Sequence, residues 1–280
     1  MRRHVTLAVA TLLALCGAGS ANALAPPDLP GLTAPQIVER NAQARGGEPA
    51  WRRIETMAWT GYAETSSAPG RHVPFLLEQK RPGKTRFEVV EPSGMKAIRA
   101  YDGSSGWKQR PAAAGPPEVT PYANDELSFA RGAQVIEGPL MDYASKGALI
   151  SLSGIDAIDG HRTYVLDARL PSGGLHRVWV DATSFLELRH DREFHDASGR
   201  VAVATMRYRD YHAFEGLQLP VVIETGGGGQ PLNRLVIERV ALNPPIEDEA
   251  FDRPEAVTVR RGKISVDTRG AAKPDAARRP

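Results

Sequence analysis

The sequence is poor in cysteine, with Cys16 the only one in 280 residues. Internal disulfides are therefore excluded, and a site built from several cysteine ligands is excluded with them. Long apolar runs are also missing, because residues 5–15 span eleven residues and a membrane-spanning helix needs about twenty. Catalytic signatures are absent too: there is no Gly-x-Ser-x-Gly, and Ser93-Gly-Met-Lys96 lacks the companion motifs of penicillin-binding enzymes. We therefore predict that the protein is not an enzyme.

The N-terminus has the pattern of a secretory signal. Two arginines precede the apolar run, and Ala21-Asn22-Ala23 supplies the small residues of a peptidase site. We expect residues 1–23 to be a signal peptide and the mature protein to be periplasmic. The run Leu13-Ala14-Leu15-Cys16 partly resembles a lipid-attachment signal, but its third residue is larger than that signal allows. Lipid anchoring at Cys16 is therefore the less favoured alternative.

Charge is unevenly distributed along the chain. Residues 253–280 hold eight Lys or Arg and three Asp or Glu with little apolar periodicity, which predicts a disordered basic tail. The whole chain carries +2, so residues 24–252 are acidic, at −5. A nucleic-acid-binding domain needs a basic face, so nucleic acid is excluded as a partner. Residues 24–31 are expected to be a short linker.

Residues 32–252 are expected to form one domain of the α+β class, mainly β. Capping and breaker residues predict helices over 33–46, 124–131 and 139–146, and a short helix or turn over 49–53. Alternating apolar and polar residues, bounded by Gly, Pro and Asp, predict strands. These strands are 57–64, 75–80, 86–90, 95–101, 106–108, 149–153, 162–170, 175–181, 186–194, 200–211, 217–224 and 232–242.

The links between these strands are mostly too short for a helical crossover, which predicts an antiparallel meander. A sheet of ten or more strands tends to curl. We therefore expect a curved sheet that forms an incomplete barrel. The helices at 33–46 and 124–146 are the candidates to cover its concave side.

The histidines favour no metal site. His190 and His195 each precede an aspartate, but an odd separation on a strand places the two rings on opposite faces. Both are predicted to be exposed hairpin residues, and the sequence predicts neither a metal nor a cofactor.

Apolar side chains carry the functional prediction instead. The candidates for a hydrophobic ligand cavity are the larger apolar residues of the predicted strands and of the helix at 139–146. They are Trp59, Phe75, Leu77, Phe87, Val89, Trp107, Leu140, Tyr143, Leu166, Val178, Leu186, Leu188, Met206 and Tyr208. For each, packing in an ordinary core is the alternative, because alternation identifies a face but not what that face contacts.

Six segments in order along the chain carry a family resemblance. They are Ile37–Gly47, Glu78–Pro82 with Arg86, Tyr101–Trp107, Gly138–Gly147, Val180–Asp181 with Leu186–Glu187, and Asn243–Asp248 with Phe251. In this order and spacing, the sequence resembles the outer-membrane lipoprotein-sorting protein family, with the LolA/LolB-like periplasmic lipoprotein carrier fold. The resemblance covers residues 32–252.

The resemblance implies a half-barrel whose concave side shelters acyl chains beneath covering helices, without catalytic residues. The implied partners are lipid acyl chains or a lipoprotein, in outer-membrane lipoprotein or lipid trafficking, and the protein is expected to be a monomer. The alternative is an envelope sensor or protein-interaction module on the same fold, with an envelope protein as partner.

Overall fold

A computed structural model describes residue 29 and residues 31–254, except 66–67, 113, 134–135, 172 and 228–229. The chain divides into two units, Met1–Leu32 and Thr33–Pro280, and the architecture below is that of the second. The predicted signal peptide and the tail beyond residue 254 lie outside the described residues.

Helix α1 (Ala34–Ala44) begins where the sequence predicts. The Thr33 N–H donates to Gln36 Oε1 over 2.9 Å, which satisfies one of the free backbone donors at a helix start. The helix ends at two glycines with positive φ, and the Gly47 N–H donates back to the Ala42 carbonyl over 2.8 Å. Helix α2 (Glu48–Arg52) follows directly.

Two further helical segments complete the set within the described residues: α3 (Asn124–Arg131) and the 3-10 helix η1 (Asp248–Phe251). The Glu126 carboxylate accepts from the Ala123 N–H and so caps α3. None of the helices in the described part of the chain has the length and apolarity needed to cross a bilayer.

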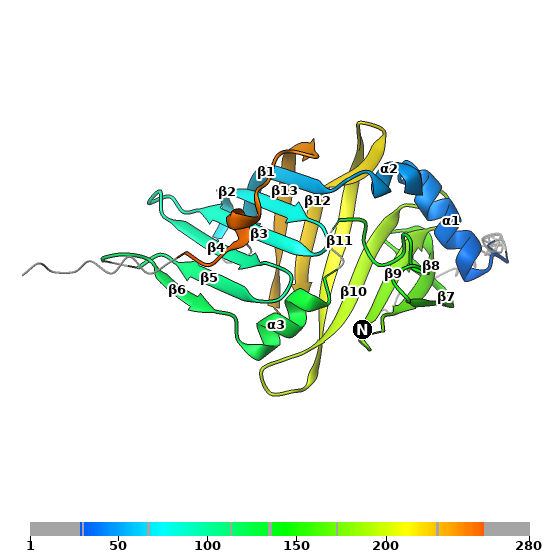
Figure 1. The fold of residues 1–280 in the computed structure, drawn as a ribbon. Coiled ribbons are helices and arrows are strands. Elements are labelled where there is room, and N and C mark those ends of the chain that lie inside the picture. Colours follow the sequence, from blue (N-terminus) through cyan, green and yellow to red (C-terminus); the bar gives the residue numbers. More distant parts are fainter. Residues whose placement is uncertain are drawn as a thin grey trace, which may run out of the picture. The chain divides into compact units, whose positions relative to one another are not determined.

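The described strands form one antiparallel sheet of thirteen, ordered β6-β5-β4-β3-β2-β1-β13-β12-β11-β10-β9-β8-β7. Two meanders therefore meet where β1 pairs with β13, and the sheet curves without closing (Figure 1). The predicted fold class, an incomplete antiparallel barrel with helical cover, is confirmed. The strands are β1 (Thr56–Thr65), β2 (Ala68–Lys80), β3 (Lys84–Val90), β4 (Lys96–Tyr101), β5 (Gly106–Arg110), β6 (Glu118–Pro121), β7 (Leu149–Ile158), β8 (His161–Arg169), β9 (Leu175–Asp181), β10 (Glu187–His195), β11 (Val201–Phe214), β12 (Leu217–Gly227) and β13 (Gln230–Leu242).

Close approach of the backbones marks the seam between the two meanders. The β1–β13 register shifts between Thr60 and Gly61. A Cβ at Gly61 would run into the Val236 carbonyl oxygen, so this position accepts no side chain without a shift of β13.

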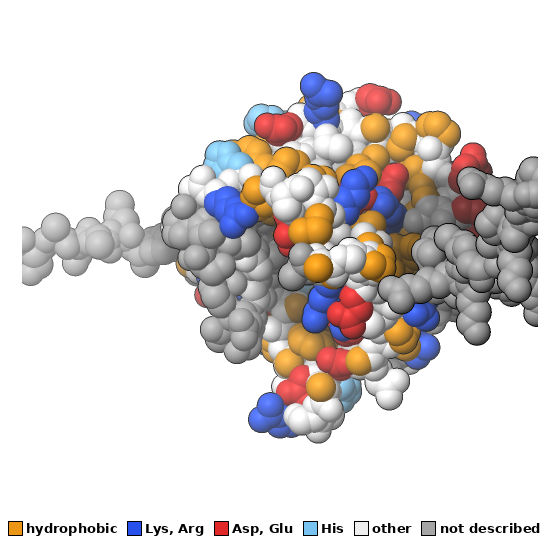
Figure 2. Space-filling view, turned by 90° about the vertical axis from the view of Figure 1, so that its left-hand side faces the viewer, with side chains coloured by type: hydrophobic (Ala, Val, Ile, Leu, Met, Phe, Trp, Pro, Cys, Tyr) orange, Lys and Arg blue, Asp and Glu red, His pale blue; other side chains and the backbone are white. Residues whose placement is uncertain are grey.

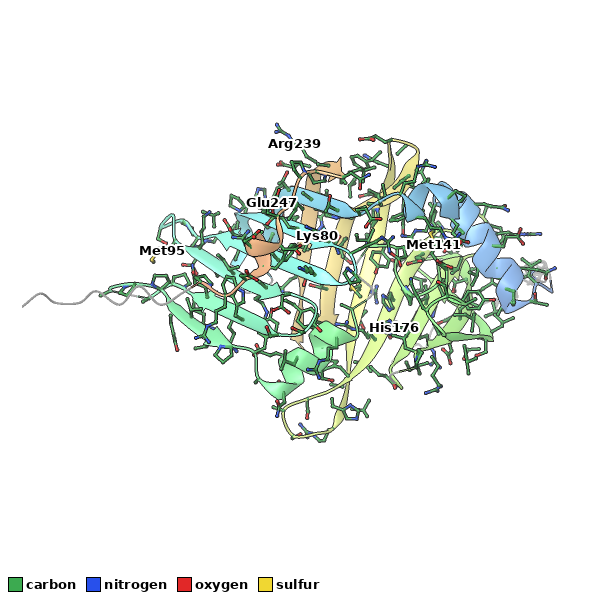
Figure 3. The ribbon with its side chains drawn as sticks, in the orientation of Figure 1. Lys80, Met95, Met141, His176, Arg239 and Glu247 are labelled. Carbon is green, nitrogen blue, oxygen red and sulfur yellow. The ribbon has the colours of Figure 1, made fainter. Side chains whose placement is uncertain are left out.

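Register assigns the faces of the sheet. Residues directly opposite in antiparallel strands share a face, so the pairs Trp59–Leu77 and Leu77–Phe87 lie together. Trp51 of α2 packs with Trp59 in one buried cluster, which makes this the covered, concave face. The chain that follows β13 lies against the convex face, where Lys80 Nζ donates to the Ile246 carbonyl and the Trp107 indole N–H donates to the Phe251 carbonyl (Figure 3 labels Lys80).

Two sequence predictions are corrected. No strand was predicted between 108 and 149, but Glu118–Pro121 form strand β6, whose Lys108–Thr120 and Gln109–Val119 pairs extend the sheet beyond β5. The predicted helix at 139–146 is a run of turns. Asp142 there has φ +54°, which breaks a helix, and Lys146 Nζ donates to the Gly138 and Met141 carbonyls that helical N–H groups would otherwise occupy.

Candidate functional site

An apolar row crosses the concave face through directly paired residues. Ala63 on β1 lies opposite Leu235 on β13, and Leu235 lies opposite Ile223 on β12. Ile223 in turn lies opposite Tyr208 on β11, and Met206 lies two residues before it on the same face. The row therefore runs continuously over the seam between the two meanders.

Cover over this face is partial. Trp51, Ile136 and Met141 pack with Trp59 and Phe75 into a fully buried cluster beneath α2 and the turns at 136–147 (Figure 3 labels Met141). Further along the same face the apolar side chains are only partly buried; they are Leu77, Phe87, Val89, Ile223 and Leu235. A sheet face that stays apolar beyond its packed cover leaves area for a ligand.

Thirteen of the fourteen predicted cavity residues fall into three groups. Trp59, Phe75, Leu140, Leu166 and Val178 are buried in the protein interior, so packing is their observed role. Leu77, Phe87, Val89, Met206 and Tyr208 are half-buried on the concave face. The remaining partly buried residues lie in turns or at a bulge: Tyr143, Leu186 and Leu188. Ligand contact by residues of the second group stays a prediction.

Trp107 departs from the predicted set. It lies opposite Ala100 on the convex face, and its indole N–H donates to the Phe251 carbonyl over 2.8 Å. The concave position on β5 belongs to Lys108, which lies opposite Arg99. Trp107 therefore anchors η1 to the back of the sheet and cannot line the concave side.

Helix α3 bridges the two halves of the concave face. Its Glu126 accepts from Lys108 Nζ at 2.8 Å and pairs with Arg99 at 2.7 Å. Burial acts to raise the pKa of Glu126, but hydrogen bonds from Lys108, the Ala123 N–H and Arg99 together lower that pKa to about 2. Towards β10, Phe129 meets the Phe194 ring edge-on at 5.2 Å between centroids. The helix is therefore held by ionic contacts on one side and aromatic contacts on the other.

Polar groups buried on the concave face were not predicted. Arg45 at the end of α1 pairs with Glu187 of β10 over 3.1 Å and donates to the Glu137 carbonyl over 2.8 Å. Burial raises the pKa of Glu187, although Arg45 and then Lys146 oppose the shift. The Arg45 guanidinium also lies over the Trp51 ring at 4.3 Å, so this pair ties both covering helices to the sheet.

His176 and His190 form a buried pair, with Nδ1 of the first 2.8 Å from Nε2 of the second (Figure 3 labels His176). The prediction that His190 is an exposed hairpin residue is wrong, because its side chain is buried on the concave face. No cluster of three potential metal ligands occurs among the residues that the structure describes. Burial, with Arg192 and Lys146 nearby, lowers the pKa of His176 to about 4, and burial lowers the pKa of His190 well below its ordinary range.

We predict that acid destabilises the protein through this pair. An unfolded histidine titrates near pH 6.5, so from about pH 6.5 down to pH 4 the unfolded chain binds more protons than the folded one. Stability is then fully present above pH 6.5 and falls by up to about 1.4 kcal/mol per pH unit for each histidine. Urea unfolding at pH 7.5 and pH 5 measures the difference.

His195→Gln, a change at an exposed site on the same strand, is the control and should keep the wild-type pH dependence. His176→Gln should make the stability of the protein depend less steeply on pH. Equal urea midpoints at the two pH values in the wild type would contradict the prediction.

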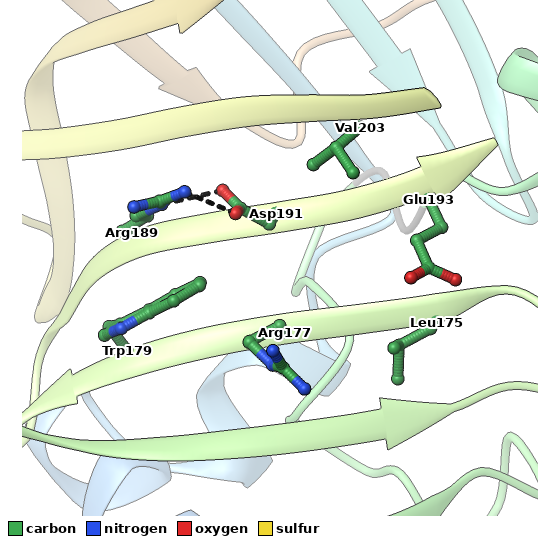
Figure 4. A pocket seen from close by; sticks show the side chains of 7 residues that line it. All are labelled: Leu175, Arg177, Trp179, Arg189, Asp191, Glu193 and Val203. Carbon is green, nitrogen blue, oxygen red and sulfur yellow. Dashed lines mark hydrogen bonds and ion pairs between the residues drawn. The ribbon is translucent and has the colours of Figure 1, made fainter. Parts of the chain in front are cut away.

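The hollows in the described part of the chain include the following two. The first, of about 260 Å³, is on the convex face of β9 and β10 (Figure 4), where Arg189 pairs with Asp191 and lies 4.4 Å above the Trp179 ring. Arg177, which also lines this hollow, pairs with Asp167 of β8. The second, of about 470 Å³, lies where the end of α3 faces the β2–β3 and β4–β5 turns. Three cations and one carboxylate line it: Arg81, Arg131, Lys146 and Glu137.

Surface charge on the end of the sheet near β6 shows no patch of one sign. Figure 2 shows acidic and basic side chains scattered among apolar ones on this side.

An open, curved antiparallel sheet with a partly covered apolar concave face defines a half-barrel fold. Solved structures with this fold include a LolA superfamily protein from Nitrosomonas europaea, 18% identical, with a TM-score of 0.50 over 79% of this chain and 98% of that one. An outer membrane lipoprotein-sorting protein domain from Vibrio parahaemolyticus is 13% identical, with a TM-score of 0.52 over 77% of this chain and 94% of that one.

A DUF1329 family protein from Desulfovibrio piger is 14% identical, with a TM-score of 0.50 over 78% of this chain and 97% of that one. No protein-family model matches the sequence, and no curated protein matches it. The chain therefore has the fold of LolA superfamily and lipoprotein-sorting proteins, and the predicted resemblance is confirmed at the level of the fold.

Proposed function

We propose that this protein is a periplasmic binding protein that shelters the acyl chains of a lipid or lipoprotein between the concave sheet face and the covering helices. One observation carries the proposal: the half-buried apolar side chains that continue the covered cluster across β3, β2, β13 and β12. An acyl chain in water is unfavourable by about 0.8 kcal/mol per CH₂, so such a face can hold it without polar chemistry. The fold of proteins described as lipoprotein-sorting supports the same assignment.

The proposal assigns the protein to trafficking of lipids or lipoproteins towards the outer membrane, as a carrier without a catalytic step. The signal-like N-terminus supports a periplasmic site of action. Native mass spectrometry of protein purified gently from the periplasm tests it. Co-purifying phospholipid or lipoprotein is expected. A lipid-free protein that retains a partner protein would instead favour the interaction-module alternative.

We predict that Leu77→Asp weakens apolar ligand binding at least tenfold and leaves the domain folded. Leu77 is half-buried on the concave face between Trp59 and Phe87. A carboxylate there can stay hydrated in the empty protein, but an acyl chain would have to dehydrate it, which is costly. Fluorescence titration with N-phenyl-1-naphthylamine, a neutral apolar probe, should show at least a tenfold loss of affinity.

Leu76→Asp is the matched control, because Leu76 is half-buried on the opposite face of the same strand. It should bind the probe as the wild type does. Equal loss in both variants, or no loss in either, would place the ligand elsewhere.

A further inference from the structure

Arg192 is a buried cation without a counter-ion. Its side chain lies on the concave face of β10 and is 4% exposed. Within the part of the chain that the structure describes, Nε has no hydrogen-bond partner, and no carboxylate forms an ion pair with the guanidinium. Burial lowers the pKa of Arg192 to about 10, so the group stays charged at neutral pH.

Such an arrangement is unfavourable in the empty protein. Moving one ion out of water costs several kcal/mol unless a partner compensates, and buried arginines are almost always paired. The compensation visible here is the Phe129 ring of α3, whose centroid lies 3.7 Å from the guanidinium carbon. A cation–π contact contributes about 2 kcal/mol when desolvated and falls short of that cost.

The groups around Arg192 add no negative charge. His176 on β9 and Ala204 on β11 lie directly opposite it on the same face. The neutral histidine pair flanks it on that side, and a Cβ at Gly132, after α3, would lie 3.7 Å from its Nη1. Arg131 and Ala133, the neighbours of Gly132 in the chain, line the 470 Å³ hollow. The charged residues that line this hollow are three cations and one carboxylate. This end of the concave face therefore has an excess of positive charge.

The apolar row begins beside this charge. Met206 lies opposite His190, two residues from Arg192, and the row continues over Tyr208 and Ile223 to Leu235. An amphiphile with an anionic head at Arg192 can therefore lay its chain along the row. The ester and amide groups that link acyl chains to a lipid carry no charge. Such a group placed at Arg192 would leave the guanidinium uncompensated.

We propose that Arg192 recognises the anionic headgroup, a carboxylate or a phosphate monoester, of an amphiphile whose acyl chain lies on the concave apolar face. This inference rests on the proposed function and narrows its ligand from acyl chains in general to anionic amphiphiles. The planar guanidinium fork suits both headgroups, because each presents two oxygens at matching spacing.

Displacement of N-phenyl-1-naphthylamine tests the proposal with dodecanoate, dodecyl phosphate and dodecanol at pH 8. In the wild type, at least one of the two anions should bind ten times or more tighter than the alcohol, and comparison of the two anions identifies the preferred headgroup. Arg192→Met should bind all three within about threefold of one another. Its ligand-free form should melt no lower than the wild type, because an unpaired buried charge has been removed.

Arg189→Met is the matched control, from the convex face of the same strand, and should keep the wild-type preference. Arg192→Lys keeps the positive charge but lacks the planar guanidinium, so it should prefer anions over the alcohol more weakly than the wild type does. This variant preserves the test if Arg192→Met does not fold. Equal binding of anions and alcohol by the wild type, or an unchanged preference in Arg192→Met, overturns the inference and leaves the proposed function standing. Failure of the wild type to bind the probe would count against the proposed function itself.

Discussion

Leu140→Asp is expected to unfold the domain. Leu140 is completely buried, in the run of turns at 136–147 whose Ile136 and Met141 pack against Trp51. The substitution removes a buried leucine side chain, at about 2–5 kcal/mol, and forces a carboxylate into the same space at a cost of several kcal/mol more. A domain of this kind has about 5–15 kcal/mol of stability to lose.

Thermal unfolding followed by circular dichroism, with gel filtration, measures the effect. Leu140→Ala is the control and should fold with a loss of about 2–5 kcal/mol. If Leu140→Asp melts within a few degrees of the wild type, the 136–147 segment is not part of the folded interior. Together with Leu77→Asp, which should fold and lose binding, the variant separates interior packing from the ligand face.

Arg45→Met is expected to lower the free energy of unfolding by about 3–5 kcal/mol, the usual result of breaking a buried ion pair by removing one partner. Glu187 is then left buried without its cation, and the Glu137 carbonyl loses the hydrogen bond from Arg45. The contact between the guanidinium and the Trp51 ring is lost as well. Urea unfolding at pH 7 measures the change.

The double variant Arg45→Met, Glu187→Leu tests the cause. It removes both charges, so it should be more stable than Arg45→Met alone. If the free energy of unfolding of Arg45→Met lies within about 1 kcal/mol of the wild-type value, water already compensates the Glu187 carboxylate.

The sequence predicts the sheet well because its signals are local. Alternation and turn residues located all strands except β6, which lies in a Pro- and Ala-rich segment without alternation. The error at 139–146 has a different origin. Helical spacing is present there, but the Lys146 amine takes the carbonyls of Gly138 and Met141, a contact that no local pattern reveals.

The site was less predictable because the face of the sheet on which a side chain lies depends on the lengths of the turns. Four residues separate Tyr101 from Gly106, and this spacing pairs Ala100 with Trp107, which turns the indole to the convex side. Residues 189–193 of β10 are all polar, so alternation assigns no face to Arg192. The Arg45–Glu187 pair joins segments far apart in the chain, and only the assembled fold brings them together.

The strand order has a kinetic consequence. Every pair of neighbouring strands in the sheet is consecutive along the chain except β1 and β13, which join Met57 to Leu242. Each meander can therefore form by zipping short hairpins, whereas the β1–β13 pairing must close a very long loop and is entropically slow. Folding is thus expected to be limited by the joining of two preformed halves. A bulky side chain at Gly61, which lies on that junction, should slow refolding more than an equally destabilising change inside either half.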